Sequence, residues 1–227
     1  MKSKTLTLLF SIAMLLLWSC NEDPFDEQSG TFTDKRDGQV YEWVRIGEQI
    51  WMAENLRATK YNDGTTIPYV ADSSTWYNLS TPAYCWYDDD GNKYKKDYGG
   101  LYNWYSVNTG KLCPKGWHIP TKEEWEILIN FLGGDQVAGG KMKESGIIHW
   151  NSPNYGATNE SGFTALPGGV MMPKGTFRSI GVSAYYWSAN ELDARSAWAY
   201  ELDMSIEGII SFDPLKSGGS SIRCIKD

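Results

Sequence analysis

The segment from Leu112 to Glu126 constrains the fold more than any other part of the chain, because it joins a cysteine, a rigid aromatic turn and a capped helix. Thr121 is a good N-cap, and Glu124 three residues later completes a capping box. Apolar residues then recur at i, i+3, i+4 and i+7, a spacing that places Trp125, Leu128, Ile129 and Leu132 on one face of a helix, toward the core. The pattern predicts a helix that Gly133-Gly134 ends, with Glu123 and Glu126 on its solvated side.

Strand signals flank this helix on both sides. Residues 39–46 alternate in polarity and are followed by Gly47-Glu48 and then by 49–53, which predicts a hairpin. Asp90-Gly91 predicts a second hairpin, and 101–105 a short helix. Four later segments read as strands, at 185–188, 198–202, 208–212 and 221–225. The chain between Gly139 and Phe163 is rich in loops, where binding residues are often found.

The first twenty residues carry an export signal. Lys2 and Lys4 precede a short apolar run from Leu6 to Leu17, which is typical of a signal peptide and shorter than the roughly 20 residues of a membrane span. The run ends in Leu17-Trp18-Ser19-Cys20, which is similar to a bacterial lipobox. We therefore predict a signal peptide over 1–19, a lipidated Cys20, an acidic tether over 20–30 and one domain over 31–227. The expected location is the outer membrane, as a cell-surface lipoprotein held by its lipid alone.

The charge of the chain excludes one class of partner. The formal net charge is −7, and loss of Lys2 and Lys4 with the signal peptide leaves 19 basic against 28 acidic residues, a balance near −9. Nucleic acid binding needs basic patches, so we expect no nucleic acid partner. The mature chain keeps ten tryptophans beside fourteen tyrosines, which is more aromatic area than a core ordinarily uses.

Three cysteines remain after Cys20, an odd number in an oxidising compartment. We favour a disulfide between Cys113 and Cys224, which leaves Cys85 as a buried thiol. A loop of that length would remove about 4–5 kcal/mol of denatured-state entropy in the simple chain model. Pairing of Cys85 with Cys113 is the alternative.

Several motifs together resemble one known family. They include Trp51-Met52-Ala53-Glu54-Asn55-Leu56, Cys113-Pro114-Lys115-Gly116-Trp117, Asn159-Glu160-Ser161-Gly162-Phe163-Thr164 and Ile222-Arg223-Cys224. In this order they resemble the Fibrobacter succinogenes major paralogous domain family of secreted and surface proteins in Bacteroidetes. The family has no well-defined activity, so the resemblance implies location and fold more than function.

A second, more distant likeness concerns the fold. Ile119-Pro120-Thr121-Lys122-Glu123-Glu124-Trp125-Glu126 is similar to a signature of formylglycine-generating, sulfatase-modifying enzymes. That likeness implies an α+β, C-type-lectin-like domain with two helices, small antiparallel sheets and long loops. The oxidase chemistry of those enzymes needs a pair of cysteines, and only Cys224 lies in the corresponding half, so the activity is not carried over.

The sequence offers little support for catalysis or metal binding. His118 and His149 are the only histidines, no Gly-x-Ser-x-Gly elbow accompanies them, and we interpret both as structural. No Cys-x-x-Cys spacing suggests zinc. An EF-hand aligned on Gly91 would place Trp86 at the first ligand position, so that interpretation fails. We expect no catalytic residue, no metal and no cofactor, and calcium bound by other loop oxygens stays open.

Aromatic side chains on loops favour a binding or adhesion function. Such rings pack on the apolar faces of sugars or anchor protein interfaces. We expect a non-catalytic module for carbohydrate or a surface protein, with candidate contacts at Trp150, Asn154, Tyr155, Asn159, Glu160, Tyr185 and Asn190. The alternatives are a lectin-fold enzyme with an unrecognised carboxylate site and a structural subunit of a surface assembly.

Overall fold

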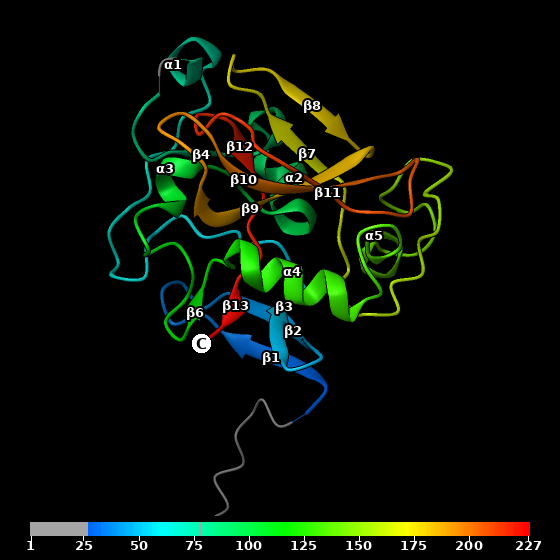
Figure 1. The fold of residues 1–227 in the computed structure, drawn as a ribbon. Coiled ribbons are helices and arrows are strands. Elements are labelled where there is room, and N and C mark those ends of the chain that lie inside the picture. Colours follow the sequence, from blue (N-terminus) through cyan, green and yellow to red (C-terminus); the bar gives the residue numbers. More distant parts are fainter. Residues whose placement is uncertain (1–26, 78) are drawn as a thin grey trace, which may run out of the picture.

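The computed structural model describes residues 27–77 and 79–227. The predicted signal peptide over 1–19 and the predicted lipidation of Cys20 lie outside the described residues. Ser29 and Gly30, predicted as tether, instead begin the first strand. The described chain forms two sheets with short helices between and around them, which is the predicted α+β class (Figure 1).

The first sheet brings the two ends of the fold together. Its strand order is β1-β2-β3-β13-β6, and every neighbouring pair is antiparallel. The bounds are β1 (Ser29–Thr33), β2 (Val40–Ile46), β3 (Gln49–Met52), β6 (Trp117–His118) and β13 (Ile225–Lys226). The hairpin of β2 and β3 confirms the sequence prediction. Because β13 pairs with β3, β1 and the C-terminus lie at the same end of the molecule (Figure 1).

The second sheet is larger than predicted. Its strand order is β11-β10-β9-β7-β12-β5-β4, with β8 paired to β7, and β7 runs parallel to β9. The bounds are β4 (Tyr84–Cys85), β5 (Leu101–Asn103), β7 (Gly168–Met171), β8 (Phe177–Ile180), β9 (Ser183–Glu191), β10 (Ala197–Asp203), β11 (Ile210–Phe212) and β12 (Gly219–Ser220). The longest pairing joins β9 to β10, where the sequence predicted two strands.

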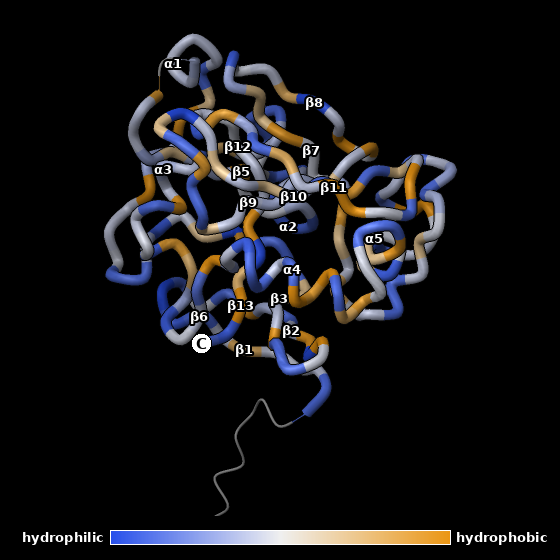
Figure 2. The backbone as a smooth tube through the Cα atoms, viewed as in Figure 1, coloured by the Kyte–Doolittle hydropathy of each residue, from blue (hydrophilic) through white to orange (hydrophobic). Residues whose placement is uncertain are grey.

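Helix α4 (Lys122–Phe131) lies between the two sheets (Figure 1). Its predicted capping box is present, since Thr121 Oγ1 accepts from Glu124 N at 3.2 Å and Glu124 Oε2 accepts from Thr121 N at 2.8 Å. The ring of Trp125 lies 4.9 Å from Trp51 in β3 and 4.7 Å from Tyr200 in β10. Figure 2 shows hydrophilic and hydrophobic residues alternating along this helix. The apolar stripe therefore faces both sheets.

The other helices of the described residues are short. They are α1 (Ser73–Tyr77), α2 (Gly91–Tyr98), α3 (Trp104–Val107) and α5 (Ala138–Met142), with a 3₁₀ turn, η1, over Tyr87–Asp89. The predicted hairpin at Asp90-Gly91 is wrong, because the Asp90 side chain accepts from Lys93 N and caps α2 there. The predicted helix over 101–105 is wrong in its first half, because Leu101–Asn103 pair as β5 and the helix begins at Trp104.

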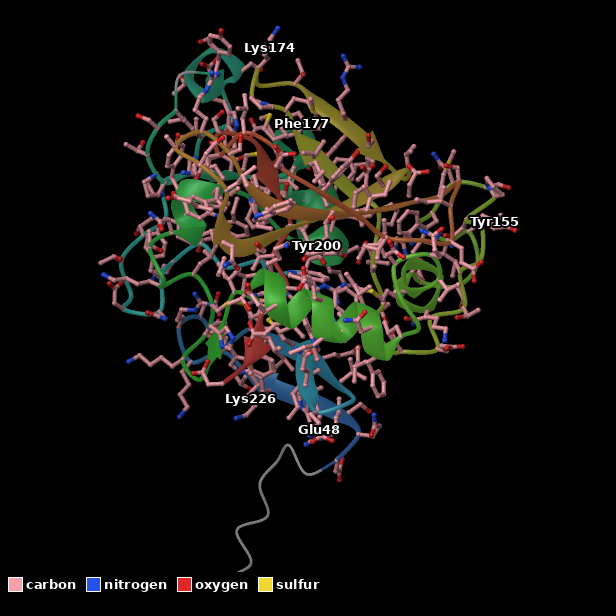
Figure 3. All side chains as sticks on the ribbon, viewed as in Figure 1. Glu48, Tyr155, Lys174, Phe177, Tyr200 and Lys226 are labelled. Carbon is pink, nitrogen blue, oxygen red and sulfur yellow. A yellow bond between two sulfur atoms is a disulfide. The ribbon has the colours of Figure 1, made fainter. Side chains whose placement is uncertain are left out.

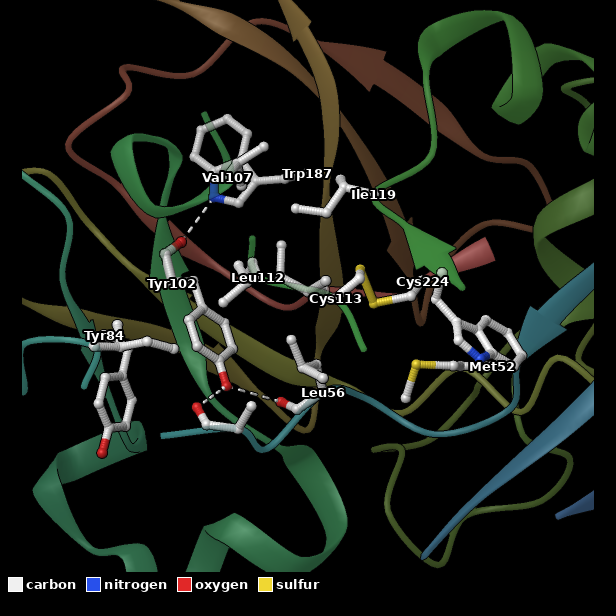
Figure 4. Close-up of a cluster of buried hydrophobic side chains, with 14 of the residues drawn as sticks. Met52, Leu56, Tyr84, Tyr102, Val107, Leu112, Cys113, Ile119, Trp187 and Cys224 are labelled. Atoms are coloured by element: carbon white, nitrogen blue, oxygen red, sulfur yellow. Dashed lines mark hydrogen bonds between the residues drawn. A yellow bond between two sulfur atoms is a disulfide. The ribbon is translucent and has the colours of Figure 1, made fainter. Parts of the chain in front are cut away.

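The predicted disulfide between Cys113 and Cys224 is present and buried. Figure 4 shows it packed among Met52, Leu112 and Ile119 in the largest buried cluster. It closes a loop with a sequence separation of 111 residues. Cys85 is a buried free thiol, so the alternative pairing with Cys113 is wrong.

Three of the family-like motifs meet at the side chain of Arg223, which is 1% exposed. Its Nε donates to Asn55 Oδ1 at 2.7 Å, and Nη1 donates to the carbonyl of Met52 at 3.0 Å. The carbonyls of Phe163 and Thr164 accept from Nη1 and Nη2. No carboxylate among the described residues forms an ion pair with it; backbone and amide oxygens accept these hydrogen bonds, and the guanidinium also lies over the rings of Phe163 at 4.5 Å and Tyr186 at 5.6 Å. These motifs therefore hold the first sheet, the 163–164 loop and the C-terminal segment together.

Candidate functional site

The predicted contacts on the 144–156 loop hold the loop in place. Trp150 is 1% exposed and its Nε1 donates to the carbonyl of Ala165 at 2.9 Å, so its ring offers no surface to a ligand in this structure. Asn154 is also buried, and its amide donates to the carbonyls of Glu144 and Gly146. Tyr155 is 59% exposed and lies at the edge of the molecule (Figure 3). Of these three predicted contacts, only Tyr155 has a side chain exposed to solvent.

The other four predicted contacts lie in three places. Asn159 forms a turn in which its side chain bonds Thr164, and the exposed Glu160 pairs with Lys141 at 2.9 Å. Tyr185 packs edge-on against Phe212 at 5.8 Å. Asn190 Oδ1 accepts from Lys122 N at the start of α4. The structure does not gather the seven predicted residues into one site.

Both histidines are held by carboxylates, in line with the structural role predicted for them. His118 Nδ1 lies 2.7 Å from Asp227 Oδ1, and Nε2 lies 2.9 Å from Glu124 Oε1. Partial burial lowers the pKa of His118, but the hydrogen bonds to Asp227 and Glu124 outweigh it and raise that pKa above its usual value. Two carboxylate partners require both ring nitrogens to donate, which only the charged imidazolium does. His149 Nδ1 lies 2.9 Å from Glu144.

A groove lies between α4 and β11, and we name it the α4–β11 groove. It has a volume of about 610 Å³, within the range of roughly 300–1,000 Å³ that is usual for small-molecule sites. Its lining residues are Glu126, Ile129, Asn130, Gly134, Asp135, Gln136, Tyr200, Ile209, Ile210 and Ser211. Ile129, Tyr200 and Ile209 are buried, whereas the polar side chains are exposed. The groove therefore combines an apolar floor with a polar rim.

The electrostatics of this groove are mildly acidic. Glu126 pairs with Lys122 at 3.1 Å, and Asp135 in the turn after α4 also lines the groove. Desolvation, with the nearby charges of Glu126 and Glu123, raises the pKa of Tyr200. The hydroxyl of Tyr200 stays protonated and donates to the carbonyl of Lys122 at 3.3 Å. Figure 3 shows Tyr200 directly above α4.

The wall of the groove is fixed by α5. Ile209 N donates to the carbonyl of Asp135 at 2.8 Å, and Gly140 N donates to that of Glu207 at 2.6 Å. Gly139 has no room for a side chain, because a Cβ there would overlap the Gly208 backbone. These contacts hold residues 207–211 against the turn after α4, so the groove exists before any ligand arrives.

Lys143, at the end of α5, is fully buried and fixes the same segment. Its Nζ donates to the carbonyls of Tyr155 at 2.9 Å, Asp203 at 2.9 Å and Ile206 at 2.7 Å. Burial lowers the pKa of Lys143 to about 8, while three acceptors match the three protons of the ammonium. The side chain thus joins the predicted loop region to the strand end that leads into the groove.

Sequence reasoning missed the lining of this groove. Glu126 was predicted as solvated, and no role was predicted for Asn130, Asp135 or Gln136. The available signal was the grouping of amide and carboxyl side chains around the Gly133-Gly134 cap. Their partner surface, Ile209–Ser211, comes from a strand some seventy-five residues later, and no spacing rule links the two.

A second hollow of about 540 Å³ lies beside β1, and we name it the β1 groove. Its lining comes from three segments, namely 28–31, 42–44 with Ala53, and 160–162. The predicted contact Glu160 lies on its rim.

The described ranges hold no group of three or more His, Cys, Asp or Glu side chains that could bind a metal. Within the same ranges, no helix is both long and apolar enough to cross a membrane.

Comparison with known proteins gives one match. A family model described as the Fibrobacter succinogenes major domain matches residues 44–226. The match spans all four segments that meet at Arg223 and the disulfide. No curated protein and no solved structure matches the chain.

Proposed function

The chain belongs to the Fibrobacter succinogenes major domain family, and from this premise we propose that it is a surface-anchored module that binds a carbohydrate or a protein partner without transforming it. The α4–β11 groove carries this proposal. It is preformed, and it sets amide, hydroxyl and carboxylate groups around aliphatic and aromatic floor residues. Ligand sites generally pair an apolar floor with a few fixed polar groups in this way.

The structural contacts of four reactive side chains favour binding over catalysis. Cys224, which an oxidase of the sulfatase-modifying type would need as a thiol, is bonded to Cys113. The ring nitrogens of His118 both face carboxylates. Lys143 and Arg223 are occupied by carbonyl oxygens. These four side chains therefore serve the scaffold, and the groove presents groups suited to recognition.

We also propose a C-type-lectin-like topology and a lipid anchor at Cys20. The topology is supported by the first and last strands, which belong to one sheet, and by a disulfide from the region before α4 to the C-terminal segment. The basic start and the short apolar run before Cys20 support the anchor. The first strand begins at Ser29, so the tether would be short and the domain would stay close to the outer membrane surface.

The test is a glycan array and a partner pull-down with the full chain and groove variants. Asn130→Ala and Gln136→Ala remove exposed amides from the rim, and we expect each to weaken saturable binding at least several-fold. Asn92→Ala is the matched control, because that exposed amide lies on α2, outside the groove. Binding that all three variants retain equally would refute the groove as the site.

Two further outcomes separate the alternatives. Turnover of a bound glycan that Glu126→Gln or Asp135→Asn abolishes would favour an enzyme, since paired carboxylates can hydrolyse glycosidic bonds. Absence of any ligand together with ordered self-assembly would favour a structural subunit. Either result would replace the binding proposal.

A further inference from the structure

The outer edge of β1 carries open backbone groups. In its pairing with β2, Asp34 N donates to the carbonyl of Gln39 and Arg45 N donates to that of Gln28. The Cα register pairs Ser29 with Val44, Thr31 with Glu42 and Thr33 with Val40. Hydrogen-bonded and non-hydrogen-bonded pairs alternate along antiparallel strands, so Ser29, Thr31 and Thr33 are the non-bonded set. Their N–H and C=O groups point away from β2.

Nothing in the described part of the chain covers this edge. No hydrogen bond from residues 27–77 or 79–227 reaches the outward groups of the three residues, and all three are exposed. At five residues, β1 is longer than the strands at the other sheet margins, β6, β4, β8 and β11. Figure 1 shows it at the margin of the fold. An uncovered edge of this kind is a template for pairing with another strand.

The sequence of β1 lacks the usual protection. Proteins guard exposed edges with charged side chains or proline, and Ser-Gly-Thr-Phe-Thr contains neither. The chain has a formal charge of −7, so two copies repel one another on average. The β1 edge itself is uncharged, so pairing there places no like charges of the strand opposite one another.

The outward groups are also self-complementary. Ser29 and Thr33 are equally spaced about Thr31, so a two-fold axis at Thr31 pairs the outward set of one copy with that of another. Each of the three pairs then exchanges both backbone bonds, as in a regular antiparallel ladder. Thr31 would face Thr31, and Ser29 would face Thr33, in cross-strand contacts that β-branched and hydroxyl side chains favour.

We propose that β1 pairs antiparallel with β1 of a second copy of this chain, joining the first sheets of both copies into one continuous sheet. The pairing places the two β1 grooves on either side of the axis, since Ser29 and Thr31 line each groove. It uses neither the α4–β11 groove nor its ligand, so it stands or falls independently of the proposed function.

Charge pairs at the axis test the proposal. The full chain in detergent should sediment as a dimer, and Thr31→Lys should weaken the dimer several-fold, because two lysines then face each other. Thr31→Glu alone should weaken it likewise, and an equimolar mixture of the two variants should restore it. Val40→Lys is the matched control, since it adds the same charge to an exposed position on β2 and leaves the outer edge unchanged. Circular dichroism checks that all variants fold.

A cross-link tests the register. Facing residues of a bonded antiparallel pair have Cα atoms about 5.5 Å apart, within the range that a disulfide bridges. Thr31→Cys should therefore form a covalent dimer under mild oxidation in proteoliposomes, whereas Val40→Cys should not. A wild-type chain that stays monomeric in detergent, together with a Thr31→Cys variant that forms no cross-link in vesicles, would overturn the proposal. A dimer that the opposite-charge mixture fails to restore would overturn it as well.

Discussion

Replacement of Gly139 by alanine sets two effects of known size against each other. Alanine is favoured over glycine inside a helix by about 1 kcal/mol, so an isolated α5 would gain stability. In the folded chain, a Cβ at this position would lie 2.6 Å from the carbonyl carbon of Gly208 and 2.8 Å from the carbonyl oxygen of Glu207. Ordinary van der Waals contact begins at 3.4 Å, and the carbonyl oxygen of Gly208 is nearer still than its carbon, so the 207–208 backbone has to retreat by more than about 0.8 Å.

The cost of the steric clash should exceed the gain in helix propensity. Overpacking in a filled core costs about 1–3 kcal/mol, and the upper end applies here because the obstacle is backbone that cannot change rotamer. Subtraction of the helix gain leaves a net loss of about 2 kcal/mol. For a domain of this size, that loss lowers Tm by roughly 4–8 °C.

Denaturation and hydrogen exchange measure the two consequences separately. Urea titration should show the lower stability with an unchanged m-value. The amides of Gly140 and Ile209, which bond Glu207 and Asp135, should exchange faster, because the wall of the α4–β11 groove has moved. A Gly139→Ala variant as stable as the wild type, with unchanged protection at Gly140, would refute the close packing of α5 on 207–208.

Three further predictions concern the scaffold. Lys143→Met leaves three buried carbonyls without a donor, which at the low end of about 1–3 kcal/mol each costs roughly 3 kcal/mol, and thermal melting checks it. A Tm for this variant equal to that of wild type would instead mean that the hydrogen bonds of the Lys143 ammonium make no net contribution to stability. Because the pKa of His118 is raised in the folded state, its stabilising contribution is complete below its unfolded pKa of about 6.5 and is lost as pH rises through the higher folded value. The Tm of wild type should therefore fall towards that of His118→Asn as the pH rises above about 6.5, and two parallel curves would contradict this. Cys113→Ala with Cys224→Ala should cost about 4–5 kcal/mol in the chain-entropy model, and a much smaller shift in the urea midpoint would point to a compact denatured state.

Local signals predicted the parts of the fold that depend on neighbours in sequence. The capping box at Thr121 and the stripe from Trp125 to Leu132 fixed α4, and the Gly47-Glu48 turn fixed the first hairpin. At Asp90-Gly91 the same residue types serve a turn or an N-cap, and packing of Tyr94 in the core decided for the helix. The pairing of β13 with β3 and the parallel contact of β7 with β9 depend on contacts far apart in sequence, which periodicity does not encode.

The candidate site was harder to predict for a related reason. An aromatic residue on a loop is equally suited to surface contact and to filling the space beneath the loop, and the structure assigns Trp150 to the second role. The groove instead joins ordinary polar residues at the end of α4 with a strand from the last fifth of the chain. Only the folded backbone brings them within reach of one ligand.

The bond between Cys113 and Cys224 also determines how the molecule would respond to mechanical load. A pull applied through the N-terminus first reaches β1 and β2, which can unzip one ladder bond at a time. The chain between the two sulfur atoms cannot lengthen while they are joined, so α4 and both walls of its groove lie inside a segment shielded from extension. A load carried between the N-terminus and the C-terminal segment would therefore extend the chain before Cys113 while the groove stays intact.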